Sequence, residues 1–589
     1  MRWGLALAVV LAAGTVVGMT SAAPPLTAPW VDLNSDYQAR VVGQRGIGID
    51  QAVNAADVNG DGIPDALVSA PGTRSIVYVV YGRRGWKQTV PVASLPASQG
   101  YRLVTDADIS GDMPVANAGD VNGDGVPDQL VGVSNGAGTV YVVYGQRGSV
   151  APTIDLDNLA AGQGYRITGA PGDGAGTDVA GAGDVNGDGV PDQVIGASQA
   201  FQAPGRAYVV YGRRPGANIN LAALPANRGY HIQGADGNEA GNSVANAGDV
   251  NGDGVPDQLV GAMTSDFAYL VYGQRTASPK TIFVGLPGTW GYGMHGVPIT
   301  LTGSSVANAG DVNGDGIPDG LIGASCEADG PRAANIYIVY GERTPPQGYL
   351  ELPRLGGAQG YSITDSRGQC AGTSVAGMPD MNGDGVPDQL IGAFGAPVAG
   401  GAGAAYLVYG QRGSPQRVDL ASLQKSQGYG IGGIPQAEAG WFVADAGDLN
   451  ADGVDEAWVW APNFSPTPTS TGADFLVGTP QPRATAVSSA ARLRRGRVTI
   501  RIACGALPSA GCAGTITLRK AGERSPVYGS ARFSVPPNAT TGVAVTLKRG
   551  TVQRFRKVHR LAADALVLTR RSAPATALSL KRRIELRRG

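Results

Sequence analysis

Nine-residue segments rich in Asp, Asn and Gly carry the most recognisable chemistry in this sequence. In the segment DVNGDGVPD, Asp120, Asn122, Asp124 and Asp128 stand at positions 1, 3, 5 and 9. A tight loop with this spacing turns its side-chain oxygens toward one centre, and position 7, Val126, adds a backbone carbonyl. Calcium prefers roughly six to eight hard oxygen ligands at about 2.4 Å. The segment is therefore predicted to bind Ca²⁺, with water or a bidentate carboxylate completing the shell.

The segment occurs seven times, so the sequence predicts up to seven calcium ions. The last copy departs most, because Ala451 replaces a Gly and Glu456 replaces the final Asp. The predicted ligands, copy by copy, are Asp57, Asn59, Asp61, Ile63 and Asp65; Asp120, Asn122, Asp124, Val126 and Asp128; Asp184, Asn186, Asp188, Val190 and Asp192; Asp249, Asn251, Asp253, Val255 and Asp257; Asp311, Asn313, Asp315, Ile317 and Asp319; Asp380, Asn382, Asp384, Val386 and Asp388; and Asp448, Asn450, Asp452, Val454 and Glu456.

Two other interpretations of these loops are less favoured. Asp, Asn and Gly make turns without a metal, but three carboxylates crowded in one loop would repel one another without a cation. An EF-hand or dockerin loop would place an acid at position 12 and continue into a helix. Position 12 is apolar in the first six copies: Val68, Val131, Ile195, Val260, Ile322 and Ile391. We therefore expect a strand after each loop and a stabilising, non-catalytic role for calcium.

The spacing of the loops predicts the elements that position them. Successive copies begin 63, 64, 65, 62, 69 and 68 residues apart, a period that fits one four-stranded propeller blade with its connections. Three apolar segments accompany each loop: one before it, one after it, and one such as AYLVYG at 268–273. A fourth, such as YRITG at 165–169, follows. An all-β fold with a seven-bladed propeller is the prediction.

The number of fourth segments predicts how the ring closes. Six lie between successive loops, the last unit ends after Gly478 without one, and YQARVVG at 37–43 stands before the first loop. We expect this N-terminal strand to complete the last blade, which would remove the exposed sheet edges of an open ring.

These residues resemble a known family. The pattern GxxVAxAGDVNGDGVPDQLVGA is similar to the FG-GAP repeat of the integrin α N-terminal β-propeller and its bacterial relatives, over residues 30–480. The resemblance implies seven blades, calcium in the hairpin loop between a blade's first two strands on a lower face, and ligands met on the opposite, upper face. Most copies lack the Phe of the repeat's name; Gly440, Trp441 and Phe442 come nearest to it.

The two ends of the chain differ from the repeats. Residues 1–23, with Arg2 before an apolar run and small residues at 21–23, are predicted to be a secretory signal peptide. Residues 481–494 are expected to be a linker and 495–589 a small β-sandwich-like domain. Residues 483–589 contain 23 Lys or Arg and three acids, net +20, which leaves −21 for residues 1–482. The basic domain is open to interpretation as a binder of anionic wall polymer, as a partner for the acidic propeller, or as a solvated surface; few aromatic residues make nucleic acid an unfavourable partner.

Cysteine use and hydropathy agree with export. Cys326 and Cys370 fall in loops expected on the upper face, and Cys504 and Cys512 lie close in sequence, so we predict two disulfides. No later stretch is long and apolar enough to span a membrane, so no transmembrane segment is expected after signal cleavage. The expected location is secreted or associated with the cell surface.

The sequence favours a binding function over catalysis. We expect an adhesion or recognition module whose upper face binds an extracellular glycan or protein. The alternative is an extracellular hydrolase or lyase that acts on polysaccharide with upper-face carboxylates such as Asp173, Asp178, Asp236 or Glu239. Only three His residues are present, and no GxSxG, HExxH or phosphate-binding loop is found, so no catalytic residue is predicted.

Overall fold

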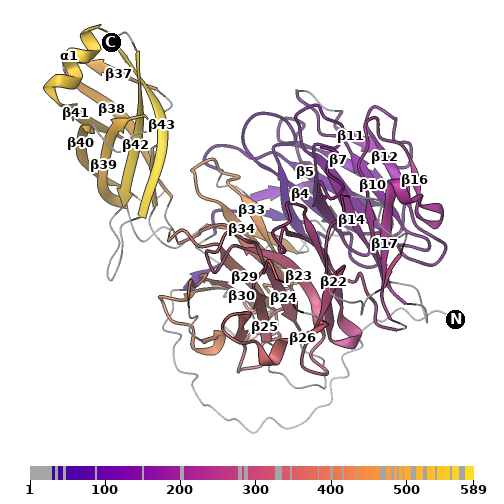
Figure 1. The fold of residues 1–589 in the computed structure, drawn as a ribbon. Coiled ribbons are helices and arrows are strands. Elements are labelled where there is room, and N and C mark those ends of the chain that lie inside the picture. The colour runs from indigo at the N-terminus through magenta and orange to yellow at the C-terminus, as the bar shows by residue number, and fades with distance from the viewer. Residues whose placement is uncertain are drawn as a thin grey trace.

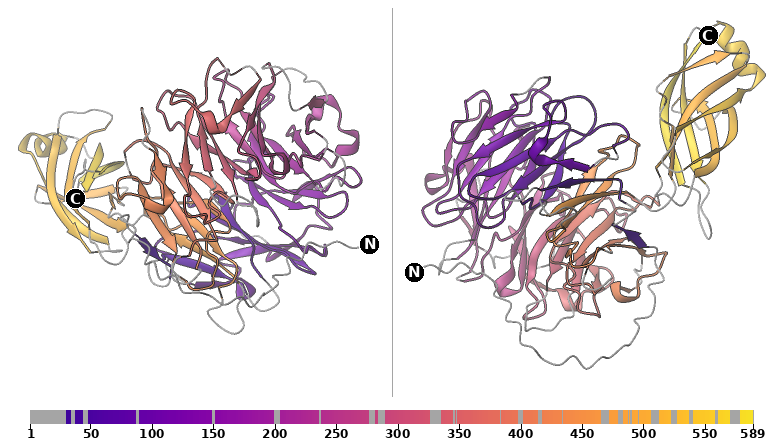
Figure 2. Two further views of the ribbon diagram at one scale, coloured as in Figure 1. Left: turned by 90° about the horizontal axis from the view of Figure 1, so that it is seen from below. Right: turned by 180° about the vertical axis from the view of Figure 1, so that it is seen from behind.

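The computed structural model describes residues 30–588 with internal gaps, the longest of which are 326–334, 465–471, 506–511 and 570–577. Seven five-stranded sheets stand around a common axis, and an eighth sheet forms a separate C-terminal body (Figure 1, Figure 2). The predicted all-β seven-bladed propeller is confirmed.

The first four strands of each blade are antiparallel neighbours. Blades 1 to 4 consist of β3 (Ala52–Ala56), β4 (Asp65–Ala70), β5 (Ser75–Val80) and β7 (Gly100–Thr105); β8 (Val115–Gly119), β9 (Asp128–Val133), β10 (Thr139–Val143) and β12 (Gly164–Thr168); β13 (Val179–Gly183), β14 (Asp192–Ala197), β15 (Arg206–Val210) and β17 (Gly229–Gln233); and β18 (Val244–Gly248), β19 (Asp257–Ala262), β20 (Phe267–Val271) and β22 (Gly291–His295).

Blades 5 to 7 repeat this order. They consist of β23 (Thr302–Gly310), β24 (Asp319–Ala324), β25 (Asn335–Val339) and β27 (Gly360–Thr364); β28 (Val375–Met378), β29 (Asp388–Ala393), β30 (Ala404–Val408) and β32 (Gly428–Gly432); and β33 (Val443–Gly447), β34 (Glu456–Ala461), β35 (Ala473–Val477) and β2 (Ala39–Val42). The first strands of neighbouring blades contact one another all the way round, and β33 contacts β3, so the ring is closed.

The N-terminal strand closes the ring as predicted. Strand β2 pairs antiparallel with β35, so that Arg40 lies opposite Phe475 and Val42 lies opposite Ala473. The side chain of Gln38 accepts a hydrogen bond from Asn450 Nδ2 at 2.7 Å, across 412 residues of sequence. The last blade is therefore built from both ends of the repeat region.

Each blade also has a fifth strand that the sequence analysis missed. It is a short parallel strand on the outer edge, and in blades 1 to 5 and 7 it comes from the next blade's connection between third and fourth strands. Blade 6 receives the segment ahead of β2 instead. In blade order these strands are β11 (Thr153–Asp155), β16 (Ile219–Asn220), β21 (Thr281–Phe283), β26 (Tyr349–Glu351), β31 (Val418–Asp419), β1 (Trp30–Asp32) and β6 (Thr89–Pro91).

Short 3₁₀ turns accompany some of these connections: η1 (Val92–Ser94), η2 (Leu221–Ala223), η3 (Ala226–Arg228), η5 (Leu352–Arg354) and η6 (Leu420–Ser422). A further turn, η4 (Met263–Ser265), lies between β19 and β20.

The hydrophobic core lies between the blades rather than in one centre. Strand β19, for example, is buried at every residue because neighbouring blades cover both of its faces. At the closing seam Tyr78 of blade 1 packs in one cluster with Trp458 and Leu476 of blade 7. Buried hydrogen bonds also join blades: Tyr230 of blade 3 donates to Gln258 Oε1 of blade 4 at 2.8 Å.

The C-terminal body is a closed barrel. Seven strands pair in a ring in the order β37 (Ala490–Arg494), β43 (Leu578–Arg588), β42 (Arg560–Thr569), β39 (Cys512–Lys520), β40 (Val527–Val535), β41 (Thr540–Leu547) and β38 (Arg497–Gly505), and β38 returns to β37. Strand β36 (Arg483–Ala486) pairs with β38, and helix α1 (Arg549–Lys557) follows β41.

Two features of this body differ from the sequence-based prediction. A β-sandwich-like domain was expected, but the β38–β41 pairing joins the two edges into one barrel. Residues 481–494 were assigned to a linker, yet β36 and β37 lie within that range. Alternating buried and exposed residues along β41 show how its apolar side fills the barrel interior.

Two predictions concern the N-terminus and the cysteines. Residues 1–23 lie outside the described part of the chain, so the signal peptide stays a prediction. Cys370 takes part in a disulfide, but its expected partner Cys326 lies outside the described residues, and that pairing also stays a prediction. The helices among the described residues are all too short or too polar to cross a bilayer.

Candidate calcium loops and the opposite face

The Asp-rich loops join the first strand of each blade to the second. Within the first loop, Asp57 Oδ1 accepts a hydrogen bond from Asp61 N at 2.9 Å, and Oδ2 accepts one from Gly62 N at 2.7 Å. Asn59 Oδ1 also accepts from Asp61 N. Gly60 and Gly62 have φ of +75° and +86°, a region that side chains with Cβ rarely adopt. The Asp, Asn and Gly residues therefore coil the chain so that the oxygens of positions 1, 3 and 5 gather on one side.

The carboxylate at position 9 connects the loop to the blade. Asp65 is the first residue of β4 and has no exposed surface. Its Oδ2 accepts a hydrogen bond from Val58 N at 3.0 Å, and its Oδ1 accepts one from Gly82 N at 2.9 Å, at the end of the third strand. The same pair of bonds recurs at Asp128, Asp192, Asp257, Asp319 and Asp388.

The acid at position 9 of these loops has a raised pKa, mainly because it is buried. Burial is the main cause that raises the pKa of Asp65 to about 8, and the charges of Asp61 and Asp57 add to it, against the hydrogen bond from Gly82. Burial in the same position raises the pKa of Asp257 to about 8 and those of Asp128, Asp192 and Asp319 to about 7. A divalent cation would offset this repulsion.

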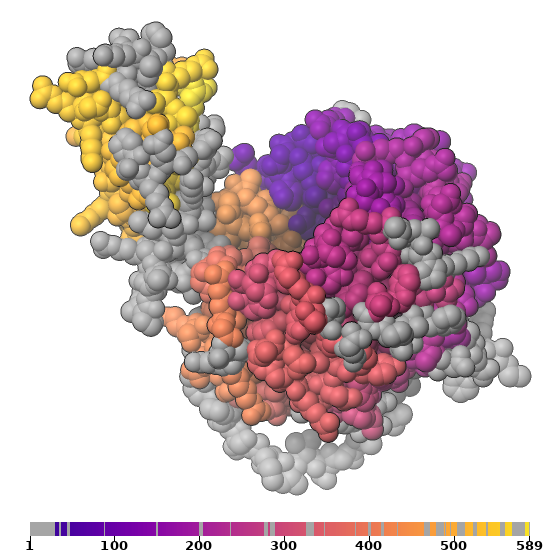
Figure 3. Space-filling model, in the orientation of Figure 1, coloured from indigo at the N-terminus to yellow at the C-terminus, as the bar shows by residue number. Residues whose placement is uncertain are grey.

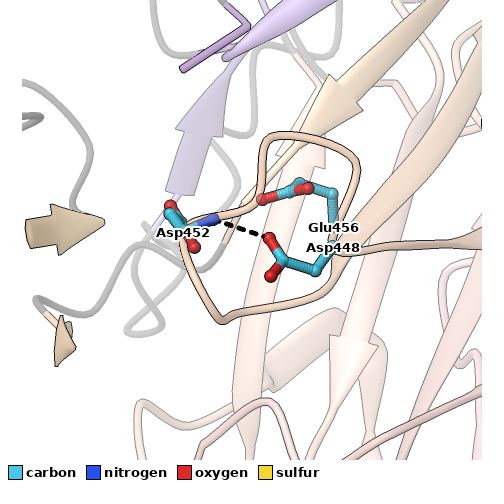
Figure 4. Close-up of side chains that lie close together, drawn as sticks. All are labelled: Asp448, Asp452 and Glu456. Atoms are coloured by element: carbon cyan, nitrogen blue, oxygen red, sulfur yellow. Dashed lines mark hydrogen bonds between the residues drawn. The ribbon is translucent and has the colours of Figure 1, made fainter. Parts of the chain in front are cut away.

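The seventh loop brings its acids together most closely. Carboxylate oxygens of Asp448, Asp452 and Glu456 lie within 4.8 Å of one another, and no other group of three acidic, His or Cys side chains in the described chain does so (Figure 4). Within the described residues, buried Asn450 Oδ1 and Glu456 Oε2 have no hydrogen-bond partner. Burial raises the pKa of Glu456 well above its usual range, and nearby Asp452 and Asp448 add to this.

The donor sets fit calcium. All seven loops offer hard oxygens from positions 1, 3, 5 and 9 and a backbone carbonyl at position 7, which is the ligand chemistry of Ca²⁺. In the seventh loop the unpartnered oxygens of Asn450 and Glu456 are additional acceptors that a cation would satisfy. This loop departs most from the repeat in sequence, and Glu456 at its position 9 accepts a hydrogen bond from Asn450 Nδ2.

Arginine side chains bridge neighbouring loops, a feature that the sequence analysis did not identify. Arg147 Nη2 donates to Gly125 O in the loop of its own blade at 3.1 Å, and its stem lies so close to Gly60 of the preceding loop that a Cβ there would meet it at 2.9 Å. Arg214 donates to Asp120 O of the preceding blade's loop at 3.0 Å. The signal is an Arg three residues after the Tyr of the YG that follows the third strand of blades 1 to 6, at positions 84, 147, 214, 275, 343 and 412.

The upper face contains a cavity of about 750 Å³ at the mouth of the central channel. Its lining begins with residues at the starts of first strands and near the ends of second strands, and it continues along the channel to Asn308, Gly377 and Asp445 within their first strands. The calcium loops join the opposite ends of those strands. The cavity is therefore on the face where the resemblance places ligands.

Two of the upper-face acids considered for catalysis, Asp173 and Asp178, are held by other groups of the protein. Asp173 is buried, pairs with Arg206 at 3.4 Å and accepts a hydrogen bond from the Tyr208 hydroxyl. Asp178 lines the cavity, and its two oxygens accept hydrogen bonds from Val179 N and Val244 N, both at 2.8 Å. Glu239 lies in a loop with φ of +50°, and Asp236 lies outside the described residues.

The fold and the loops define an integrin α-like seven-bladed propeller of the FG-GAP type. No family model matches the chain. Among curated proteins, integrin alpha pat-2 of Caenorhabditis elegans is 29% identical over 224 residues, which cover 36% of this chain and 17% of the relative. Integrin alpha-5 of Xenopus laevis is 33% identical over 196 residues, 31% of this chain and 16% of the relative. Integrin alpha-6 of Gallus gallus is 34% identical over 136 residues, 21% and 12% of the two chains.

These matches have a limited extent. The chain spans less than a fifth of the length of the curated relatives it matches, so the likeness concerns the propeller and not a whole integrin subunit. The Asp-rich loops of this chain resemble calcium-binding motifs of those propellers.

Proposed function

We propose that this protein is an extracellular, calcium-stabilised adhesion or recognition module that binds a glycan or protein through the upper face of its propeller. The observation that carries this proposal is the cavity of about 750 Å³ at the mouth of the channel, on the face opposite the calcium loops. Such a volume falls within the range of about 300–1,000 Å³ typical of small-molecule sites. The likeness to integrin α chains supports binding rather than catalysis.

The proposal separates the roles of the two faces. Calcium on the lower face holds the first and second strands of each blade together, and the upper face is left for the ligand. Secretion follows from the predicted signal peptide, and the basic C-terminal barrel is suited to hold the protein near anionic wall polymer.

Binding to arrayed glycans and arrayed extracellular proteins tests this function. The full chain without residues 1–23 is applied in calcium and again after chelation. We expect retention on one of the two arrays in calcium and weaker retention after chelation. Retention on neither array in calcium would contradict the proposed function, and release of a cleaved product from a retained glycan would replace it with the hydrolase or lyase alternative.

A further inference from the structure

The rim of the channel is built from the residues seven and six positions before the first Asp of each calcium loop. In blade 5 they lie within β23, and in the other blades they directly precede the first strand. They are Asp50 and Gln51, Met113 and Pro114, Thr177 and Asp178, Asn242 and Ser243, Ser304 and Ser305, Thr373 and Ser374, and Trp441 and Phe442. All but Met113 line the cavity. Blades 3 to 6 therefore present hydroxyl, amide and carboxylate groups at this level.

Hydrogen bonds between neighbouring blades fix these polar side chains. Ser243 Oγ accepts from Val306 N at 3.1 Å, Ser305 Oγ accepts from Val375 N at 3.1 Å, and Ser374 Oγ accepts from Val443 N at 3.0 Å. Asp178 accepts from Val244 N in the same way. Because each serine oxygen is held by the next blade, its position at the rim is set before a ligand arrives.

Blade 7 is the blade with aromatic residues at this level. Where blades 3 to 6 have polar residues, it has Trp441 and Phe442, and Trp460 also lines the cavity. Trp441 remains 39% exposed and is one of three exposed large hydrophobic side chains among the described residues. Its ring packs on Phe394 with centroids 4.4 Å apart. The cavity is thus lined by aromatic rings in blade 7 and by hydroxyl and carboxylate groups in other blades.

The acidic lining of the cavity disfavours anionic ligands. Asp50, Asp112, Asp178 and Asp445 contribute carboxylates, and no Lys or Arg stands among the described lining residues. An anionic ligand would be repelled. A pyranose ring offers an apolar C–H face for an aromatic ring and hydroxyls that both donate to carboxylates and accept from serine and threonine.

We infer that the channel mouth binds an uncharged carbohydrate, one pyranose face of which stacks on Trp441 while its hydroxyls bond to the rim of blade 1 and of blades 3 to 6. This inference rests on the proposed function and names its ligand class. An extended peptide would lie across the upper face and make few contacts inside the cavity at the centre of the ring.

Substitutions at Trp441 test the inference with the full chain in calcium. The probes are an array of uncharged oligosaccharides, an array of uronic-acid and sulfated oligosaccharides, and an array of extracellular proteins. We expect retention on uncharged oligosaccharides, a loss of about tenfold in affinity for Trp441→Ala, and retained binding for Trp441→Tyr, which keeps an aromatic face. Tyr349→Ala is the matched control, because Tyr349 is an exposed aromatic on the outer strand β26.

The outcomes separate this inference from the proposed function. Retention on proteins or anionic sugars alone would overturn the inference and leave the proposed function standing. Equal retention of the wild type and a Trp441→Ala variant with unchanged melting temperature would also overturn it, because the carbohydrate would then bind elsewhere. Retention on none of the three arrays would contradict both.

Discussion

At the scale of single residues, buried hydrogen bonds between blades are the most sensitive contacts. Tyr230 and Gln258 have no exposed surface, and the Tyr230 hydroxyl is the partner that the structure shows for Gln258 Oε1. Removing such a donor leaves a buried acceptor without a bond, which costs more than the bond itself contributes.

Tyr230→Phe is therefore expected to lower the free energy of unfolding by about 1–3 kcal/mol. Urea unfolding in saturating calcium measures it. The control is Tyr349→Phe, whose side chain is 55% exposed and whose loss of a hydroxyl should change little. Equal stability of Tyr230→Phe and wild type would mean that water or a shifted side chain satisfies Gln258.

Asp474 is a buried carboxyl group at a position that other blades fill with apolar residues. It has no exposed surface, and neither carboxylate oxygen has a hydrogen-bond partner among the described residues. The register of the third strand places Ala207, Ala268 and Ala405 at the equivalent position. Burial, and then the charge of Asp50, raise the pKa of Asp474 well above its usual range.

Asp474→Ala is expected to stabilise the protein by roughly 1–3 kcal/mol at neutral pH. The native state keeps a proton that the unfolded state releases above about pH 4, so stability falls as pH rises from there and the gain from Ala grows. Melting temperatures at about pH 5 and pH 8 in calcium measure this. A gain that is larger at the lower pH, or a loss at both, would contradict the prediction.

At the scale of elements, each candidate calcium loop connects the first two strands of its blade, and a bound ion would hold those strands together. Because the unfolded chain does not hold the ligands together, each site filled at 100 times its dissociation constant stabilises by about 2.7 kcal/mol. Chelation is expected to lower the melting temperature, and added calcium should restore it. A melting temperature that does not change with calcium at low salt would contradict the seven-site prediction.

The seventh loop allows a test of one site. Asp448→Asn with Asp452→Asn removes two of its three converging carboxylates and should lower the number of bound calcium ions by one. Isothermal titration calorimetry after chelation gives that number, and the same pair of substitutions at Asp249 and Asp253 of blade 4 is the control for a loop with the common sequence. An unchanged number for the seventh loop would remove it from the set of calcium sites.

The longer strands with a clear apolar pattern were predicted from the sequence, whereas the short outer strands and the closure of the barrel were not. The loop spacing and the unpaired segment at 37–43 were enough to predict seven blades and the strand β2 that closes them. The outer strands, such as Thr153–Asp155, are two or three residues long and show no periodicity that would distinguish them from a loop. The closure of the C-terminal barrel depends on the long-range β38–β41 pairing, which no local pattern encodes.

The candidate site was predictable to a similar degree. Ligand types and spacing indicated calcium because the chemistry is local to nine residues. The serine and threonine rim of the channel, and the arginines that bridge neighbouring loops, act between blades. Their positions follow from the closed ring, so they could be recognised only after the blades were placed.

At the scale of the whole molecule, stability depends on contributions from both ends of the repeat region. A truncation series that begins at residue 30, 33 or 44 removes nothing, β1, or β1 and β2. We expect a small decrease in melting temperature for the second chain and a sharp decrease for the third, because β2 supplies a full antiparallel ladder to blade 7. Differential scanning calorimetry measures the series, and a third chain that melts like the first would contradict the closure.

The pairing of N-terminal strands with the last blades determines when the ring can close during synthesis. A ribosome releases β1 and β2 first, but their partners β32 and β35 come at the far end of the repeat region, and the Gln38–Asn450 contact spans 412 residues. Blades 1 to 5 likewise lack an outer strand until the following blade has emerged. The ring cannot close during synthesis, so the nascent chain stays open until its last blade is complete, a state that suits passage through an export channel before folding.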